Sequence, residues 1–217
     1  MPALVCDVNE TLLDLAPLAP ILDRHLGPGA GPLWFARLLH HSTVTSLVGD
    51  HRPFGELGAA AFSSVAQSRR VEPPDGAWDE VAAAFSSLPA HLDVVPGLGR
   101  FRAAGWTVAT LTNSAPAALS GGLAAAGLVD LVDVPMTVEA VGRFKPAPEP
   151  YLHALSELGV APDDAWMVAC HDWDLAGAAA VGMHTAFVTR PGMPRSPAYP
   201  PPDVVVADLV ELADRLL

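Results

Sequence analysis

The chain has 217 residues, of which 51% are hydrophobic, and a formal net charge of -12. This length and composition predict a globular protein with one full core and a smaller appended unit, and they exclude a disordered chain. The acidic charge argues against a nucleic-acid partner, and no apolar run approaches the roughly 18–20 residues of a membrane span.

The elements that the sequence predicts begin with a short apolar strand at residues 3–7, which ends on Asp7. Apolar residues then recur at helical spacing, with no convincing strand, as far as residue 93. The helical patterns in this part lie at 18–26, 32–49, 54–70 and 79–88. Strands and helices alternate after residue 94. We expect strands at 106–112, 131–136, 165–170, 184–189 and 203–207, helices at 99–105, 115–128, 149–159, 174–182 and 208–217, and a long irregular connection at 190–203.

This alternation, with strands that are apolar along their length, predicts an α/β fold. We expect a doubly wound, Rossmann-like parallel sheet with helices on both faces. The helical segment between the first two strands is then a second unit, inserted after the first strand. We therefore divide the chain into a core domain, residues 1–14 and 94–217, and an inserted helical domain, residues 15–93.

Polar residues gather where the predicted strands end. Asp7, Thr112 with Asn113, and the run at 170–172 all follow strands, and Lys145 lies in the connection after another. The ligand crevice of an open α/β sheet lies outside the carboxyl ends of its strands, so these side chains are candidates for one site. Lys145 is also the only lysine among twelve basic residues. A compact ammonium with three donors suits a place where the wider guanidinium does not fit.

Four segments, in this order and spacing, resemble the haloacid dehalogenase superfamily. They are DVNETLLD at 7–14, LTNS at 111–114, RFKPAPEPY at 143–151 and HDWDLAGAAAVGM at 171–183. The resemblance implies a core with a helical cap domain over the active site, so the inserted helical domain matches the cap. It also implies that Asp7 is a covalent nucleophile.

Two positions decide which branch of the superfamily the chain resembles most. Its phosphatases carry a second Asp two residues after the nucleophile and a Mg²⁺-binding carboxylate four residues before the later motif Asp. Here these positions are Asn9, which cannot deliver a proton, and Cys170, a poor ligand for a hard cation. A halide needs neither a proton nor a metal to leave. The chain therefore looks closest to the metal-independent L-2-haloacid dehalogenases, which hydrolyse small 2-haloacids through an aspartyl ester to 2-hydroxy acids, without a cofactor.

The resemblance assigns catalytic roles to six residues. Lys145 pairs with Asp7 and Asp174 and keeps both ionised, and Asp174 orients or activates the hydrolytic water. Thr11, Thr112 and backbone N–H groups hold the Asp7 carboxylate and the oxyanion of ester hydrolysis. The implied catalytic set is Asp7, Thr11, Thr112, Asn113, Lys145 and Asp174.

The implied substrate-binding set is Asn9, Phe35, Tyr151, His171 and Trp173. Asn113 would donate to the departing halide or to the substrate carboxylate. The chain departs from the family in this set: Phe35 replaces the usual cap arginine, with Arg37 about 200° further round the helix, and His171 replaces the usual asparagine. We expect an imidazolium at His171, held protonated by Asp172, to take over part of the anion recognition.

Two other interpretations stay open. Asp172 could let a metal return, which would make the protein a Mg²⁺-dependent phosphatase of a small phosphorylated metabolite. The chain could also be a non-catalytic binding protein that has kept the scaffold, although Asp7, Lys145 and Asp174 argue against this. Metal dependence of activity separates the first alternative from the dehalogenase.

Expectations about partners and location follow from the same features. We expect a small haloacid as the partner, with no nucleic acid and no membrane, and the apolar cap helices could support a homodimer. The first residues lack the basic start and apolar stretch of a secretory signal. Cys6 and Cys170, which we expect as small buried groups on adjacent strands, fit a reducing compartment. We therefore expect a cytoplasmic protein.

Overall fold

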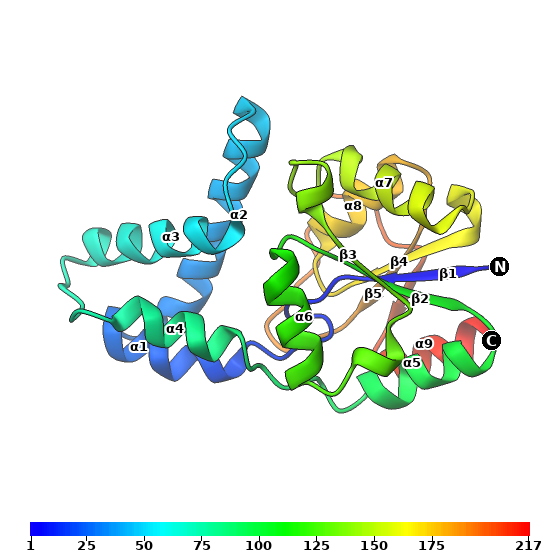
Figure 1. The fold of residues 1–217 in the computed structure, drawn as a ribbon, viewed down its shortest axis with the longest axis horizontal. Helices are drawn as coiled ribbons and strands as arrows, with labels where there is room; N and C mark the ends of the chain where they lie inside the picture. Colours follow the sequence, from blue (N-terminus) through cyan, green and yellow to red (C-terminus); the bar gives the residue numbers. More distant parts are fainter.

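The computed structural model describes residues 1–217 and has an α/β fold built on one six-stranded sheet, in which all neighbouring strands are parallel (Figure 1). The strand order is β3-β2-β1-β4-β5-β6. The strands are β1 Ala3–Cys6, β2 Thr107–Thr112, β3 Val134–Thr137, β4 Ala165–Ala169, β5 His184–Val188 and β6 Val204–Val206. Because the order reverses around β1, the carboxyl end of β1 is the switch point at which ligands bind in such sheets.

Helices cover both faces of the sheet, as the sequence predicts (Figure 1). The core helices are α5 Val94–Ala103, α6 Pro116–Ala125, α7 Pro148–Leu158, α8 Asp172–Ala180 and α9 Leu209–Leu216. Leu4 and Cys6 of β1 belong to the same buried cluster as side chains of α5, α6 and α9. Val5 belongs to a second cluster with side chains of α7 and α8. Alternate residues of β1 therefore face opposite helical layers, which explains why the whole strand is apolar.

The inserted segment folds as four helices to one side of the sheet (Figure 1). They are α1 Ala19–Leu26, α2 Ala30–Val48, α3 Phe54–Arg69 and α4 Ala77–Phe85. The two connections to the core lie side by side, because the Asp14 N–H donates to the Pro89 carbonyl (2.8 Å) and the His91 N–H donates to the Leu12 carbonyl (3.0 Å). A helical insertion after β1 is confirmed. This pairing supports the proposed boundaries at residues 14 and 94, which stay a prediction.

One predicted strand is misplaced. The sequence predicts a strand at 131–136, but β3 begins only at Val134, after a 3-10 turn at Val129–Leu131. The apolar residues Leu131 and Val132 pack against the core from this turn and do not pair with β2. Apolar character alone does not distinguish a buried turn from a strand of this length.

Two features of the surface bear on partners. None of the helices combines the length and the apolar character needed to cross a bilayer. The C-terminal end of α2 exposes Val44, Leu47 and Val48. These are the apolar cap residues that could support a homodimer, and that assembly remains a prediction.

Gly97 and Gly99 of α5 provide a matched test of core packing. A Cβ added at Gly97 would lie 2.5 Å from Leu209 Cβ and 2.9 Å from the Leu209 carbonyl carbon, whereas a Cβ at Gly99 has no such neighbour within 4 Å. We expect Gly97→Ala to lower the free energy of unfolding by about 1–3 kcal/mol through overpacking against α9. Gly99→Ala should raise it by about 0.5–1 kcal/mol, because alanine has the higher helix propensity. Urea denaturation measures both changes, and equal stabilities would contradict the close contact between α5 and α9.

Candidate active site

Asp7 lies immediately beyond β1 and its side chain is nearly buried. Its N–H donates to the Val168 carbonyl at 2.9 Å, which extends the ladder with β4 and fixes the backbone. Three side chains hold the carboxylate: Thr11 Oγ1 donates to Oδ2 at 2.8 Å, Lys145 Nζ donates to Oδ1 at 2.8 Å, and His171 Nδ1 lies 3.2 Å from Oδ2. Backbone N–H groups were also expected to bind this carboxylate, but all of its hydrogen-bond partners are side chains.

Lys145 is buried at the centre of this group. Its ammonium donates to Asp7 Oδ1 (2.8 Å), to Asp174 Oδ2 (2.5 Å) and to the Leu111 carbonyl (2.7 Å). All three ammonium donors therefore have acceptors on three separate segments. A planar guanidinium could not make these contacts from the same position, which accounts for the single lysine of the chain.

The charges of this buried group shift the two carboxyl groups in opposite directions. Burial alone would raise the pKa of Asp7, but the Lys145 ammonium and the hydrogen bond from His171 outweigh it and hold that pKa well below its usual range. Burial raises the pKa of Asp174 above its usual range, and the Asp7 charge adds to the rise. Lys145 lowers the pKa of both carboxyl groups, as expected, but at Asp174 burial and the Asp7 charge outweigh it. Asp7 is therefore the carboxyl group of the pair that the surrounding charges keep ionised.

Asp174 is completely buried in the first turn of α8, and both of its oxygens are occupied. Oδ2 accepts from Lys145, and Oδ1 accepts from the Tyr151 hydroxyl at 2.6 Å. Tyr151 is also completely buried, so its assignment to substrate binding is wrong: it positions Asp174 instead. Gly177 leaves room for this contact, because a Cβ there would lie 2.6 Å from the Tyr151 hydroxyl oxygen.

The loop after β2 is stabilised by its own polar side chains. Thr112 Oγ1 accepts from the Ser114 N–H at 3.1 Å and makes no hydrogen bond to the Asp7 carboxylate, so the expected contact between them is wrong. Asn113 Oδ1 accepts from the Lys145 N–H at 3.0 Å, which leaves the Asn113 amide group as a donor. Asn9 Nδ2 donates to Ser114 Oγ at 3.1 Å and links the turn after β1 to this loop.

His171 has carboxylates at both ring nitrogens. Nδ1 lies 3.2 Å from Asp7 Oδ2, and Nε2 lies 2.7 Å from Glu10 Oε2. Burial alone would lower the pKa of His171, but its hydrogen bonds raise that pKa well above the usual value. No ring N–H is left for a substrate anion, so the geometry does not support the expected anion recognition. Asp172 does not hold the ring either, because its carboxylate accepts the Ser196 N–H.

Glu10 is the functional candidate that sequence reasoning missed. It lies between two residues that the resemblance did assign, but an acid in a polar turn carries no further signal. Its backbone has φ of 64°, in the left-handed region that non-glycine residues rarely adopt.

Arg37 hydrogen-bonds Ser64 Oγ on α3, in line with the expectation that it does not replace the cap arginine.

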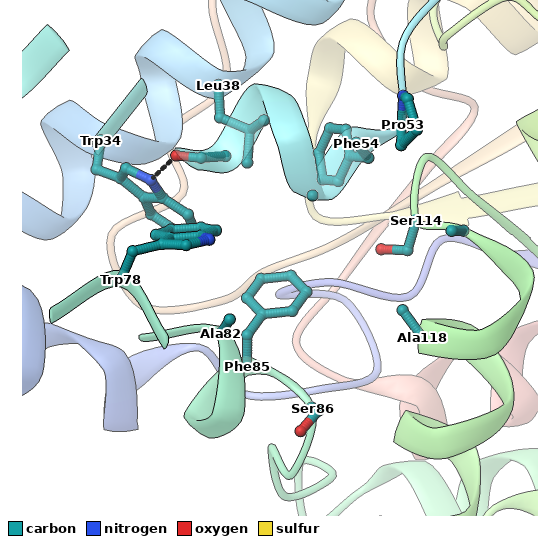
Figure 2. Close-up of a pocket in the computed structure, with 13 residues that line it drawn as sticks. Trp34, Leu38, Pro53, Phe54, Trp78, Ala82, Phe85, Ser86, Ser114 and Ala118 are labelled. Carbon is teal, nitrogen blue, oxygen red and sulfur yellow. Dashed lines mark hydrogen bonds between the residues drawn. The ribbon is translucent and has the colours of Figure 1, made fainter. Parts of the chain in front are cut away.

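Two cavities border this group of residues, one lined in part by Glu10 and His171 and the other by Ser114 of the loop after β2. The larger, about 570 Å³, reaches the His171 side of the site, and Phe35, Trp173 and Glu10 are among its lining residues. Phe35 and Trp173 also lie against the His171 ring, with ring centroids 5.8 and 5.3 Å away. The second cavity, about 280 Å³, is almost wholly apolar and lies between the cap helices and the loop after β2 (Figure 2). Its lining includes Trp34, Phe54, Trp78, Phe85 and Ser114.

Asp7 and Lys145 form a buried ion pair at the end of β1, in a sheet that carries a four-helix insertion. The family model of the haloacid dehalogenase-like hydrolases matches residues 1–182. The chain belongs to the haloacid dehalogenase-like hydrolases. The expected superfamily is thereby confirmed.

Individual haloacid dehalogenase-like hydrolases resemble the chain over nearly its full length. The (S)-2-haloacid dehalogenase 1 of Pseudomonas sp. (strain CBS-3) is 30% identical over 218 residues, which cover 99% of this chain and 96% of that protein. The structure of L-2-haloacid dehalogenase from Xanthobacter autotrophicus with chloropropionic acid covalently bound aligns with a TM-score of 0.89 and 26% identity, covering 99% of this chain and 97% of that one. A phosphoserine phosphatase of Thermus thermophilus is 28% identical over 244 residues, which cover 98% of each chain.

The metal that phosphatases among the haloacid dehalogenase-like hydrolases use does not fit the residues present here. The position expected to supply a Mg²⁺-binding carboxylate is Cys170, whose buried Sγ lies 3.5 Å from Thr11 Oγ1. No three side chains of His, Cys, Asp or Glu are arranged to share a metal ion. Mg²⁺ prefers an octahedral set of oxygen ligands, and this donor set does not provide one.

Proposed function

We propose that the chain is a hydrolytic (S)-2-haloacid dehalogenase that acts on small 2-haloacids and forms 2-hydroxy acids through a covalent ester on Asp7. The contact of Lys145 with both Asp7 and Asp174 carries this proposal. The Lys145 ammonium keeps the Asp7 carboxylate charged although the side chain is nearly buried. A weakly solvated anion of this kind is a strong nucleophile. The covalent complex of the Xanthobacter autotrophicus relative supports the same chemistry.

In the first half-reaction, an oxygen of Asp7 attacks the α-carbon of the substrate and displaces the halide, with inversion. The new C–O bond forms as the carbon–halogen bond breaks, and the halide leaves with the bonding electron pair. Lys145 and Thr11 fix the direction of the carboxylate, so attack does not require its reorientation. The free Asn113 amide is the nearby neutral donor proposed to meet the halide or the substrate carboxylate.

In the second half-reaction, water adds to the carbonyl carbon of the Asp7 ester. Lys145 Nζ and Thr11 Oγ1, which already hydrogen-bond the two carboxylate oxygens, are placed to stabilise the oxyanion of the tetrahedral intermediate. Its collapse releases the 2-hydroxy acid and restores the carboxylate. One proton of the water ends on the product hydroxyl, and the other is the net acid that dehalogenation produces. The oxygen of the water remains in Asp7.

Halide release tests the proposal directly. With L-2-chloropropionate, we expect one chloride and one 2-hydroxy acid per turnover, at the same rate with and without EDTA. D-2-chloropropionate and the haloacetates, run in parallel, report the stereochemistry and the chain length that the site accepts. Mg²⁺-dependent hydrolysis of phosphoesters without halide release would overturn the proposal in favour of a phosphatase. No turnover of either class would favour a non-catalytic binding protein.

A further inference from the structure

The imidazole of His171 is positioned on the nucleophile by groups that the dehalogenation steps above do not use. His171 lies between β4 and α8, and its Nδ1 is 3.2 Å from Asp7 Oδ2. On the far side of the ring, Nε2 is 2.7 Å from Glu10 Oε2. The rings of Phe35 and Trp173 flank the imidazole at interplanar angles of 28° and 31°. The ring is therefore fixed in direction, with one nitrogen at the reacting carboxylate.

The contact between Glu10 and His171 is made by a residue with a strained backbone, since φ of Glu10 is 64°. A left-handed backbone is unfavourable for a residue with a Cβ, so the surrounding structure must compensate. Here His91 Nε2 contacts the Glu10 carbonyl at 2.9 Å, while the Glu10 side chain binds the imidazole. Such strain is concentrated at functional positions in proteins. Glu10, His171 and Asp7 thus form a continuous row in which the imidazole lies between two carboxylates.

The residue expected to activate the hydrolytic water is poorly placed for it. Asp174 has no exposed surface, and its two oxygens already accept from Lys145 and the Tyr151 hydroxyl. Asp174 is therefore placed to orient the Lys145 ammonium and not a water molecule. His171, in contrast, lines the cavity of about 570 Å³, from which water can reach the site.

We propose that His171, oriented by Glu10, is the general base that activates the water for hydrolysis of the Asp7 ester. This rests on the proposed function, since it assigns a residue to the second half-reaction. Alkylation of Asp7 removes the negative charge that faces Nδ1, so the imidazolium releases its Nδ1 proton to solvent through the cavity. The neutral ring then takes a proton from the attacking water. Collapse of the intermediate gives the product its hydroxyl proton from the second water hydrogen, and His171 ends protonated beside the restored carboxylate.

His171→Asn tests this role, because an amide can keep a hydrogen bond to Asp7 but cannot accept the proton. We mix each enzyme rapidly with L-2-chloropropionate and follow chloride release together with the intact mass of the protein. The wild type should release chloride without a detectable adduct. The variant should release about one chloride per site in a burst and accumulate the 1-carboxyethyl ester of Asp7, with steady turnover reduced about 10²–10⁴-fold.

Two further variants secure the interpretation. Glu10→Gln leaves the imidazole in place without its carboxylate, and we expect a smaller burst with turnover reduced about tenfold. His184→Asn removes a half-exposed histidine at the start of β5 and should leave turnover and the adduct level unchanged. Loss of the burst itself, or unchanged turnover without an adduct in His171→Asn and Glu10→Gln, would overturn the assignment while leaving the dehalogenase intact. If the wild type releases no chloride, the proposed function fails and this role fails with it.

Discussion

Replacing Asp7 with Asn should reduce chloride release from L-2-chloropropionate by about 10⁴-fold or more. The amide has nearly the shape of the carboxylate, so the contacts with Thr11 and Lys145 change little in geometry. It carries no negative charge, however, and cannot displace a halide at carbon. Chloride release by purified protein measures the loss. Residual turnover near the wild-type rate would show that another group, or a contaminating enzyme, performs the displacement.

Asp172→Asn is the matched control for this change. Asp172 lies close to the site but accepts the Ser196 N–H, which an amide oxygen can also do, so we expect turnover within about twofold of the wild type. Single-turnover hydrolysis in ¹⁸O-labelled water identifies the attacked atom. The proposal expects the label to appear first in the Asp7 side chain, as detected in the peptide that contains β1. Label that enters the product directly would mean that water, not Asp7, attacks the substrate.

Much of the fold was predictable because buried segments of this chain are apolar in a pattern that distinguishes strands from helices. The strand that ends at Asp7 is apolar at successive positions since helices cover both of its faces. A parallel sheet then fixes where strand ends meet, so Asp7, Lys145 and Asp174 could be grouped from their positions in the sequence. The prediction failed for β3, where apolar residues form a turn that packs on the core.

The finer structure of the site was less predictable because it depends on which side chains meet in space. His171 was identified as unusual, but its carboxylate partner is Glu10 and not the adjacent Asp172. Tyr151 lies near Lys145 in the chain, yet it is completely buried and its hydroxyl donates to the buried Asp174 carboxylate. Neighbours in sequence at a strand end point in different directions, and a resemblance cannot assign their contacts where this chain departs from its family.

Replacing Lys145 with Met should impair folding as well as catalysis. The methionine leaves Asp7 and Asp174 buried together without the cation that now contacts both. Loss of one partner from a buried ion pair typically costs about 3–5 kcal/mol, so we expect a fall of that size in the free energy of unfolding, measured by urea denaturation near neutral pH. Adding Asp174→Asn to Lys145→Met removes one of the two unpaired carboxylates and should recover part of the stability without restoring turnover. Equal stability of the wild type and the single variant would contradict the central ion pair.

The same substitution should move the pH dependence of chloride release in a direction that the charges determine. Lys145 lowers the pKa of Asp7, so in the wild type this carboxylate stays charged well into the acid range. Without the ammonium, burial and the charge of Asp174 raise that pKa, and the acid limb of single-turnover chloride release should shift to higher pH. Lys145→Arg keeps a positive charge but replaces three separate donors by a planar group in a buried position, and should fold poorly or turn over slowly. If Lys145→Met keeps the wild-type acid limb, the lysine does not control the ionisation of Asp7, and the nucleophile must owe its charge to His171.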